Sequence, residues 1–431
     1  MFESNIDICL VCPSYLSAMP RVVKEADALA GAGFTVVVIA VQGPNFAQRK
    51  FDEELSERRA WRFETIRFST SAERLQWLVS GIRHRIAGVL PEWCWQWTTA
   101  AEYAEGRLFP ELLRAACAAR ARLYIGHLPD GIAAAALAAR RNNAQVAFDA
   151  DDFIAGQALS PRARHRADFL QRRYIGQCAY VTAASAGIAE AVERAFLVPR
   201  PTVVYNTFEW QDRRSIDNAV LDRRDTNALS LYWYSQTVGL DRGLQDAIRA
   251  VAGVDGSIEL HIRGHMSSAV RAQLIKLAAD CAVTDRVFFH QAITPEELLS
   301  RAAEHDVGLA LEPGHSPNNA LASSNKMFVY MLAGLAIAAT DVPGQASVLR
   351  SAPAAAVLYP PGDWQALANH LRRWCEDRTL LLEAKQASLH AARERWNWER
   401  EREKLLANVR EAIGGARNEG NVRRLEVGAV R

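Results

Sequence analysis

The sequence has 431 residues, more than a single hydrophobic core usually accommodates, so two domains of about 200 residues each are expected. Hydrophobic residues make up 49% and charged residues 23% of the chain, a globular composition that excludes an intrinsically disordered protein. The formal net charge of +2 gives no reason to expect a nucleic-acid partner. The N-terminal residues lack the pattern of a signal peptide, and no apolar run reaches the ~18 residues that span a bilayer. We therefore expect a soluble, cytoplasmic protein.

The seven cysteines, spread from position 9 to position 375, indicate a reducing compartment and no disulfide framework. Cys9 and Cys12 have the CxxC spacing of zinc and redox sites, but they lie in one apolar run and have no second pair. We therefore interpret them as thiols of a buried strand.

Short apolar runs alternate with helical patterns in the first half of the chain. Strands are predicted over residues 6–11, 35–40, 123–126, 146–148 and 180–183. Helices are predicted between them. The first covers residues 21–30, where apolar side chains share one helical face before Gly31 and Gly33 end the helix.

Residues 72–108 form a different kind of helical segment, rich in tryptophan and basic residues. The segment includes Trp77, Trp93, Trp95, Trp97, Arg83, His84 and Arg85. Two interpretations stay open: packing in the core and between domains, or a face that contacts a membrane or an amphipathic acceptor. The second would place the protein peripherally at the inner face of a membrane.

A polar stretch without periodicity, residues 209–227, predicts a linker between an N-terminal domain (1–208) and a C-terminal domain (228–385). Helices over residues 386–414 are expected to return to the N-terminal domain, and residues 415–431 are expected to form a flexible tail.

The second half again alternates strands with helices. Strands are predicted over residues 229–234, 259–262, 286–290, 306–311, 336–340 and 356–359. One intervening helix begins at Thr294-Pro295, with Glu297 in the capping-box position. Parallel strands need such crossovers, so the fold class is α/β, with two Rossmann-like open parallel sheets whose carboxyl ends face a cleft.

Arg242 and Gly243 follow the strand 229–234 and precede a helix. A helix start offers free N–H groups and positive potential, and a guanidinium adds bidentate contacts, so this position suits a phosphate group. The alternative is a solvated surface charge.

A similar position follows the strand 306–311, where a long loop leads to Ser324, Asn325 and Lys326 at a helix start. A cation there opposes the helix dipole, and an anion between dipole and ammonium would remove that cost. Two cationic helix starts at the ends of neighbouring strands suit a diphosphate.

Several longer pieces of sequence occur in a familiar order. They are PRVVKEADALAGAGFTVVVIA (20–40), FDADDF (148–153), VVYNTF (203–208), GLDRGLQDAI (239–248), DRVFFHQAITPEELLSRAAEHDVGLAL (285–311), NKMFVYMLAGLAIAATDVPG (325–344) and RWNWERE (395–401). Over about residues 5–410 the chain thereby resembles glycosyltransferases of the GT-B fold, in the large retaining group called family 4 (glycosyl transferases group 1).

The resemblance implies a nucleotide-sugar donor on the second domain, an acceptor on the first, and sugar transfer with retention and without a metal or other cofactor. It assigns the donor diphosphate to Arg242, Gly243, Ser324, Asn325 and Lys326. It assigns the nucleotide or sugar pocket to Arg263, Gly264 and Glu312.

The sequence departs from the family at two positions. Family members carry two glutamates around the helix that begins near Lys326, one for the donor sugar and one for the ribose. Leu321 and Val329 occupy those positions here, and neither side chain accepts a hydrogen bond. Glu312 is the candidate to reach the sugar instead.

On the acceptor side, Arg21, His127 and Asp152 lie at strand ends or in a first helical turn. His127 is a candidate base or acceptor contact, with a structural histidine as the alternative. The run Asp149-Ala150-Asp151 has the DxD spacing that holds Mg²⁺ or Mn²⁺ in GT-A transferases. A second complete α/β domain would then have no explanation, so we favour the interpretation without metal.

Together these features predict a transferase that moves a hexose-type sugar from a nucleoside diphosphate to a saccharide or glycolipid, for polysaccharide assembly. Glu312 and His127 are the candidates for a catalytic group. One alternative is a GT-B protein that binds sugar nucleotides or a partner without catalysis. Another is a sugar-nucleotide epimerase of the same fold.

Overall fold

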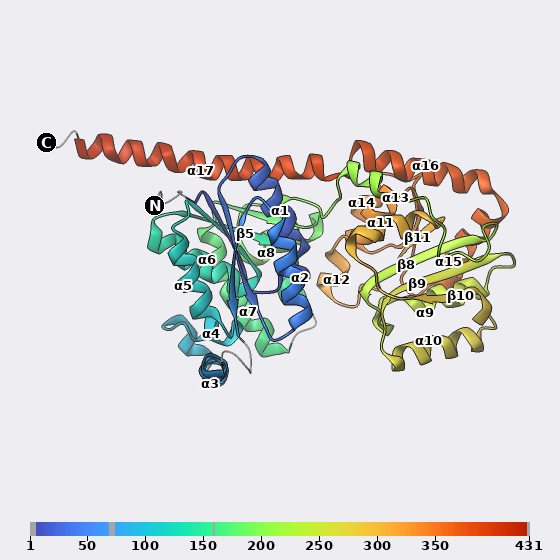
Figure 1. Ribbon diagram of the computed structural model, residues 1–431, viewed down its shortest axis with the longest axis horizontal. Coiled ribbons are helices and arrows are strands. Elements are labelled where there is room, and N and C mark those ends of the chain that lie inside the picture. The colour runs from blue at the N-terminus through green and yellow to red at the C-terminus, as the bar shows by residue number, and fades with distance from the viewer. Residues whose placement is uncertain (1–5, 69–73, 158–159, 429–431) are drawn as a thin grey trace. The chain divides into compact units, whose positions relative to one another are not determined.

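The computed structural model describes residues 6–68, 74–157 and 160–428, with side chains up to residue 414 (Figure 1). Packing divides the chain into two compact units. The first contains Met1–Ala184, Ile188–Val204 and Arg402–Arg431, and the second contains Ser185–Gly187 and Tyr205–Glu401.

The first unit is built on a parallel sheet, seven-stranded in the described residues, with the order β3-β2-β1-β4-β5-β6-β7. Its strands are β1 (Ile8–Cys12), β2 (Val36–Gln42), β3 (Arg62–Arg67), β4 (Leu123–His127), β5 (Gln145–Ala150), β6 (Tyr180–Ala183) and β7 (Thr202–Val203). All five residues of β1 are buried, as expected for a strand covered by helices on both faces. Cys9 and Cys12 are among them, so the prediction of buried strand thiols is confirmed.

Helices flank this sheet (Figure 1). They are α1 (Pro20–Gly31), α2 (Phe46–Glu57), α3 (Arg74–Val89), α4 (Ala100–Glu105), α5 (Phe109–Ala119), α6 (Leu128–Asn142), α7 (Pro161–Tyr174) and α8 (Ala186–Phe196), with the 3-10 turn η2 (Glu92–Gln96). The predicted first helix is confirmed as α1, which starts on a proline and stops before Gly33 at φ 89°.

The second unit contains a six-stranded parallel sheet with the order β10-β9-β8-β11-β12-β13. Its strands are β8 (Leu229–Thr237), β9 (Ile258–His265), β10 (Val287–His290), β11 (Val307–Ala310), β12 (Ala336–Thr340) and β13 (Ala356–Tyr359). Each of the six predicted strands is present. The two open parallel α/β sheets expected from the sequence are therefore confirmed.

The helices of the second unit include the 3-10 turns η5 (Trp210–Ser215) and η6 (Leu240–Arg242). The α-helices are α9 (Leu244–Ala252), α10 (Ser268–Asp280), α11 (Pro295–Ala303), α12 (Pro317–Leu321), α13 (Asn325–Ala333), α14 (Pro343–Leu349), α15 (Trp364–Glu376) and α16 (Arg378–Glu394). The capping box at the start of α11 is formed by Thr294 and Glu297, as predicted.

The polar stretch expected to link the domains, residues 209–227, is fastened to the second unit. Asp222 forms an ion pair with Arg263. The successive backbone amides of Leu221 and Asp222 donate to Oε2 of Glu304 at 2.9 and 2.8 Å. These bonds attach the predicted polar linker to the second unit.

The last helix, α17 (Trp398–Gly428), begins in the second unit and continues into the first from Arg402 onward. Its backbone runs on as a helix through residues 415–428, for which the sequence predicted a tail. Residues 429–431 lie outside the described part of the chain.

Candidate functional site

The strand order of the second unit indicates where a ligand binds. From β8 the chain crosses to β9 and β10 on one side, and it then returns to β11 on the other side of β8. Ligands of open parallel sheets bind outside the carboxyl ends of strands at such a switch in direction. Here the loops after β8 and β11 carry Arg242 and Glu312, respectively.

Gly243 fixes the distance between these two loops. It has φ 74°, and a Cβ atom built on it would lie 2.4 Å from the carbonyl oxygen of Leu311. A larger residue would collide there, so the turn before α9 requires glycine to approach the end of β11. A hollow of about 410 Å³ lies beside this contact, lined by Gly243, Asp246 and His315 among others.

Glu312, Ser324 and Lys326 form a hydrogen-bonded group at the same edge of the sheet. The Lys326 ammonium lies 2.8 Å from Oε1 of Glu312, and the Ser324 hydroxyl donates to that oxygen at 2.8 Å. Burial alone would raise the pKa of Glu312, but the charge and hydrogen bond of Lys326, the bond from Ser324 and the charge of Arg242 lower it to about 2. The carboxylate is therefore ionised, with both predicted phosphate-binding cations near it.

The two cations are presented differently. The Arg242 side chain is 39% exposed, and its Nε lies 3.7 Å from Oδ1 of Asp241. The Lys326 side chain is 14% exposed, and its Nζ also lies 5.5 Å from the centre of the Trp233 ring. Glu312 and Asp241 balance the two positive charges, so what suits an anion such as a diphosphate here is the partly exposed guanidinium of Arg242 and the ammonium of Lys326, and not a net positive charge.

Two residues that sequence reasoning missed position the backbone of Glu312. The Thr340 hydroxyl donates to the carbonyl oxygen of Glu312 at 2.7 Å. The fully buried amide of Gln345 donates to the carbonyl of Ala310 at 3.2 Å and to that of Thr340 at 3.0 Å. The sequence pointed to these two residues only indirectly. Thr340 lies in the family-like segment 325–344 and Gln345 directly follows that segment, but the two do not form a recognisable polar motif.

The structure does not bring Arg263 to this group. Arg263 is buried, donates to Tyr232 Oη at 3.1 Å and to the Gln291 carbonyl at 2.9 Å, and pairs with Asp222. Gly264 is close-packed, with φ 147° and a would-be Cβ 2.2 Å from the Ser235 carbonyl oxygen.

The residues at the two family glutamate positions are Leu321, at the end of α12, and Val329, in α13. Val329 is 2% exposed and belongs to the core. Asn325 is the first residue of α13, between Ser324 and Lys326.

The acceptor-side candidates of the first unit lie in a buried ion network. Arg21 donates from Nε and Nη2 to the two carboxylate oxygens of Asp149, at 2.6 and 2.8 Å. His127 lies between two carboxylates, with Nε2 3.0 Å from Glu25 and Nδ1 3.5 Å from Asp149. Asp152 accepts a hydrogen bond from Gln157 at 3.1 Å.

This network holds two positive and two negative charges. Burial would lower the pKa of His127, but hydrogen bonds and charges of Asp149 and Glu25 raise it to about 9. His127 is then a protonated imidazolium, and its positive charge helps to balance the carboxylates of Glu25 and Asp149. A side chain that already holds its proton is a poor base. The ligand atoms of Glu25, His127 and Asp149 lie close enough to hold a metal ion, but Arg21 already binds both oxygens of Asp149. A divalent cation would place excess positive charge beside that guanidinium, so the group fits a proton better than a metal.

A pH titration tests this assignment. The pKa of His127 is about 6.5 in the unfolded chain and about 9 in the folded one, so its stabilisation is complete below pH 6.5 and is lost as the pH rises through 9. We expect thermal unfolding between pH 6 and 10 to show a steeper loss of Tm for the wild type than for His127→Gln. Equal slopes would contradict a charged His127.

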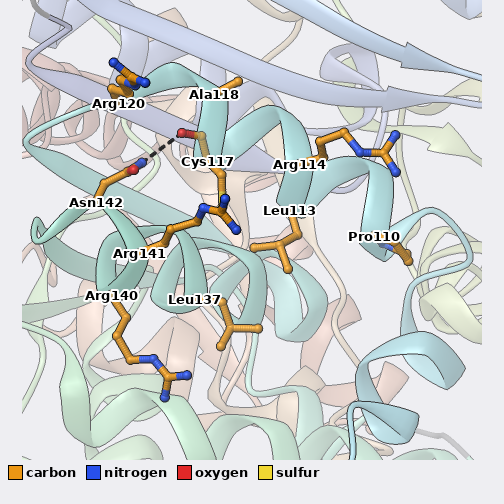
Figure 2. Close-up of a pocket in the computed structure, with 10 residues that line it drawn as sticks. All are labelled: Pro110, Leu113, Arg114, Cys117, Ala118, Arg120, Leu137, Arg140, Arg141 and Asn142. Atoms are coloured by element: carbon orange, nitrogen blue, oxygen red, sulfur yellow. Dashed lines mark hydrogen bonds between the residues drawn. The ribbon is translucent and has the colours of Figure 1, made fainter.

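Another hollow, of about 820 Å³, lies in the first unit between α5 and α6. It reaches the ends of these helices that precede β4 and β5, the edge opposite the carboxyl ends of the strands. Figure 2 shows Arg141 over the groove near Leu113 and Cys117, whereas Arg114 and Arg140 point outward. The arginines do not converge on one point, so we do not assign this groove to the donor.

Comparisons with known proteins agree with the geometry. Residues 234–377 match the family described as Glycosyl transferases group 1. Among curated proteins, no sequence matches the chain significantly.

Solved structures match along almost the whole chain. HepE of Anabaena in complex with UDP matches with a TM-score of 0.69 and 14% identity over 94% of this chain and 99% of that one. Sucrose-phosphate synthase from Thermosynechococcus elongatus matches with a TM-score of 0.68 and 14% identity over 95% of this chain and 100% of that one. WaaG, a glycosyltransferase involved in lipopolysaccharide biosynthesis, matches with a TM-score of 0.56 and 16% identity over 93% of this chain and 98% of that one. The protein therefore has the GT-B fold, and residues 234–377 of its second unit are similar to the glycosyl transferases group 1 family.

Proposed function

We propose that this protein transfers a hexose-type sugar from a nucleoside diphosphate to a saccharide or lipid-linked acceptor in polysaccharide assembly. The group 1 domain supports the reaction class. The first donor to test is UDP-glucose, because HepE has been solved in complex with that molecule.

The observation that carries the proposal is the pairing of Lys326 and Arg242 with Glu312 at the switch point of the second sheet. Transfer breaks the bond between the anomeric carbon and the diphosphate oxygen, and the bonding electrons leave with the diphosphate. An acceptor hydroxyl oxygen forms the new bond to the anomeric carbon, and its proton passes to the leaving diphosphate. Fixed positive charges stabilise the negative charge that develops there, and such stabilisation is the largest single contribution to catalysis in many enzymes. In this proposal Glu312 positions the Lys326 ammonium, and Arg242 contacts the diphosphate from the opposite loop.

We propose further that the reaction retains the anomeric configuration and needs no metal. The two cations would take the place that a divalent ion occupies at a diphosphate. Transfer measured with and without EDTA tests this point, and activity that returns only after Mg²⁺ or Mn²⁺ is added would contradict it. Proton NMR of the first-formed product reads the anomeric configuration directly.

A second candidate, a protein that binds sugar nucleotides without catalysis, is favoured by one observation. Leu321 and Val329 replace both polar contacts expected for the sugar and the ribose. Calorimetry with a panel of sugar nucleotides, followed by mass spectrometry of the same mixtures, separates the cases. Transfer or slow hydrolysis supports the enzyme, whereas binding without turnover supports the second candidate. Conversion of the donor into its epimer without an acceptor would identify an epimerase.

Replacement of Arg242 by alanine is expected to weaken UDP binding by tenfold or more, since one charged contact to a diphosphate is lost. Calorimetry with UDP measures the change. Arg271→Ala is the matched control, because Arg271 stacks on Phe289 from α10, away from the candidate site. Unchanged affinity in Arg242→Ala would remove this residue from the donor site.

A further inference from the structure

Helix α3 and the turn η2 expose an unusual number of large apolar side chains. These residues are between 50% and 83% exposed: Leu75, Leu78, Val79, Ile82, Ile86, Val89, Trp93 and Trp97. Single exposed apolar residues are normal on a protein surface, but eight large ones on one helix and the turn that follows it mark a candidate interaction site.

The helical residues of this set form one stripe. Their spacing from Leu75 is 3, 4, 7, 11 and 14 residues, which places them within about 100° of one another on a helix of 3.6 residues per turn. The opposite face is turned toward the protein. Arg83 pairs there with Glu111 at 2.7 Å, the His84 ring bonds to the Tyr103 carbonyl at 2.9 Å, and Ala87 is buried. The helix is thus held by its polar face and presents its apolar face outward.

The charges around the stripe favour a lipid surface over a protein groove. Residues 74–91 contain three arginines and one histidine but no acidic residue, and Glu92, the first residue of η2, lies 2.7 Å from His165. Arg85 is exposed on α3, and Arg162 of α7 donates to the Leu90 carbonyl at 2.6 Å, which brings a second exposed cation to the end of the helix. Cations beside an apolar stripe that ends in tryptophans are typical of helices that lie in the interface of an anionic bilayer.

The length of the helix agrees with an interfacial position. Its 16 residues extend about 24 Å, less than the hydrocarbon core of a bilayer. Among the residues that the structure describes, no helix combines the length and the hydropathy needed for a membrane crossing.

We propose that α3 and η2 form an interfacial anchor that inserts its apolar stripe into the headgroup region of an anionic phospholipid membrane. Of the two interpretations of residues 72–108, the membrane face accounts for the exposed stripe. Trp95 agrees with the packing interpretation instead, because its side chain is buried and its ring lies against that of Phe169 in α7, with the ring centres 5.5 Å apart. Residues 72 and 73 lie outside the described part of the chain. The anchor is independent of the proposed transfer reaction, since it requires only lipid.

The test is co-sedimentation of the full chain with vesicles of phosphatidylcholine alone and with about 30% phosphatidylglycerol. We expect binding to the anionic vesicles, at least tenfold weaker binding to the neutral ones, and a blue shift of tryptophan emission. The double variant Ile82→Asp/Ile86→Asp is expected to lose at least tenfold in affinity for anionic vesicles. Leu382→Asp, a 54% exposed leucine on α16, is the matched control and should bind like the wild type.

Two results would overturn the anchor. The first is a wild-type protein that stays in the supernatant when either kind of vesicle is pelleted, whether it remains a monomer or self-associates through the stripe. The second is an aspartate double variant, with wild-type Tm, that still binds as well as the control. Because the readout is sedimentation with lipid, neither result depends on whether sugar transfer is observed.

Discussion

Replacement of Lys326 by methionine is expected to lower the rate of sugar transfer by about 100-fold and to weaken UDP binding. Methionine retains most of the length of the side chain but removes the charge, so the leaving diphosphate loses a fixed cation where its negative charge develops. The change also leaves Glu312 with only the Ser324 hydroxyl and the charge of Arg242 to offset its burial, so the pKa of that carboxyl should rise. Without the Lys326 ammonium, the Glu312 carboxylate also repels the incoming diphosphate. This repulsion adds to the loss of attraction.

Three companion variants make the result specific. Lys276→Met on α10 removes an ammonium that is 75% exposed, and it should leave transfer unchanged. Lys326→Met combined with Glu312→Gln removes the uncompensated carboxylate and should recover part of the lost UDP affinity. Glu312→Gln alone should lower transfer less than Lys326→Met. UDP affinity unaffected by Lys326→Met would show that the ammonium serves only its ion pair with Glu312.

Replacement of Asp149 by asparagine is expected to destabilise the first unit by about 3 to 5 kcal/mol, among the largest effects for one substitution in this chain. The neutral amide leaves the guanidinium of Arg21 and the imidazolium of His127 in the interior with only Glu25 to balance them. Thermal unfolding of the full chain measures the change.

Asp151→Asn provides the matched control. This carboxylate is 32% exposed and lies 4.0 Å from Arg21, so its removal should change the stability by less than about 1 kcal/mol. The pair also distinguishes the network from a DxD metal site. A DxD metal site predicts that transfer depends on added Mg²⁺ or Mn²⁺ in both variants. The ion network instead predicts a loss of stability in Asp149→Asn alone.

Much of the second unit could be predicted from the sequence, because its strands are buried on both faces and read as short apolar runs. The start of α11 was predictable because Thr294, Pro295 and Glu297 act through local bonds. Lys326 could also be placed, since a strand, a long loop and a helix start determine its position at the edge of the sheet.

Other features depend on contacts that the sequence does not reveal. Strand β3 lies at the sheet edge and is partly exposed, so its sequence RFETIR lacks the apolar run of an inner strand. The role of Arg263 depends on which face of β9 it occupies, and a shift of one residue reverses that face. The network of Glu25, His127 and Asp149 joins α1, β4 and β5, so only the folded chain brings its charges together.

The bonds that fasten residues 217–225 to the second unit bear on how that unit holds the ends of its own chain. The chain passes between the units after Ala184, Gly187, Val204 and Glu401, and beside the last two crossings the Tyr205 amide donates to the Glu401 carboxylate at 2.9 Å. These last two crossings are thus tied together by one hydrogen bond within the second unit. The second unit therefore holds both the polar stretch and the residues that enter and leave it beside Val204 and Arg402, and it keeps the ends of its own chain fixed.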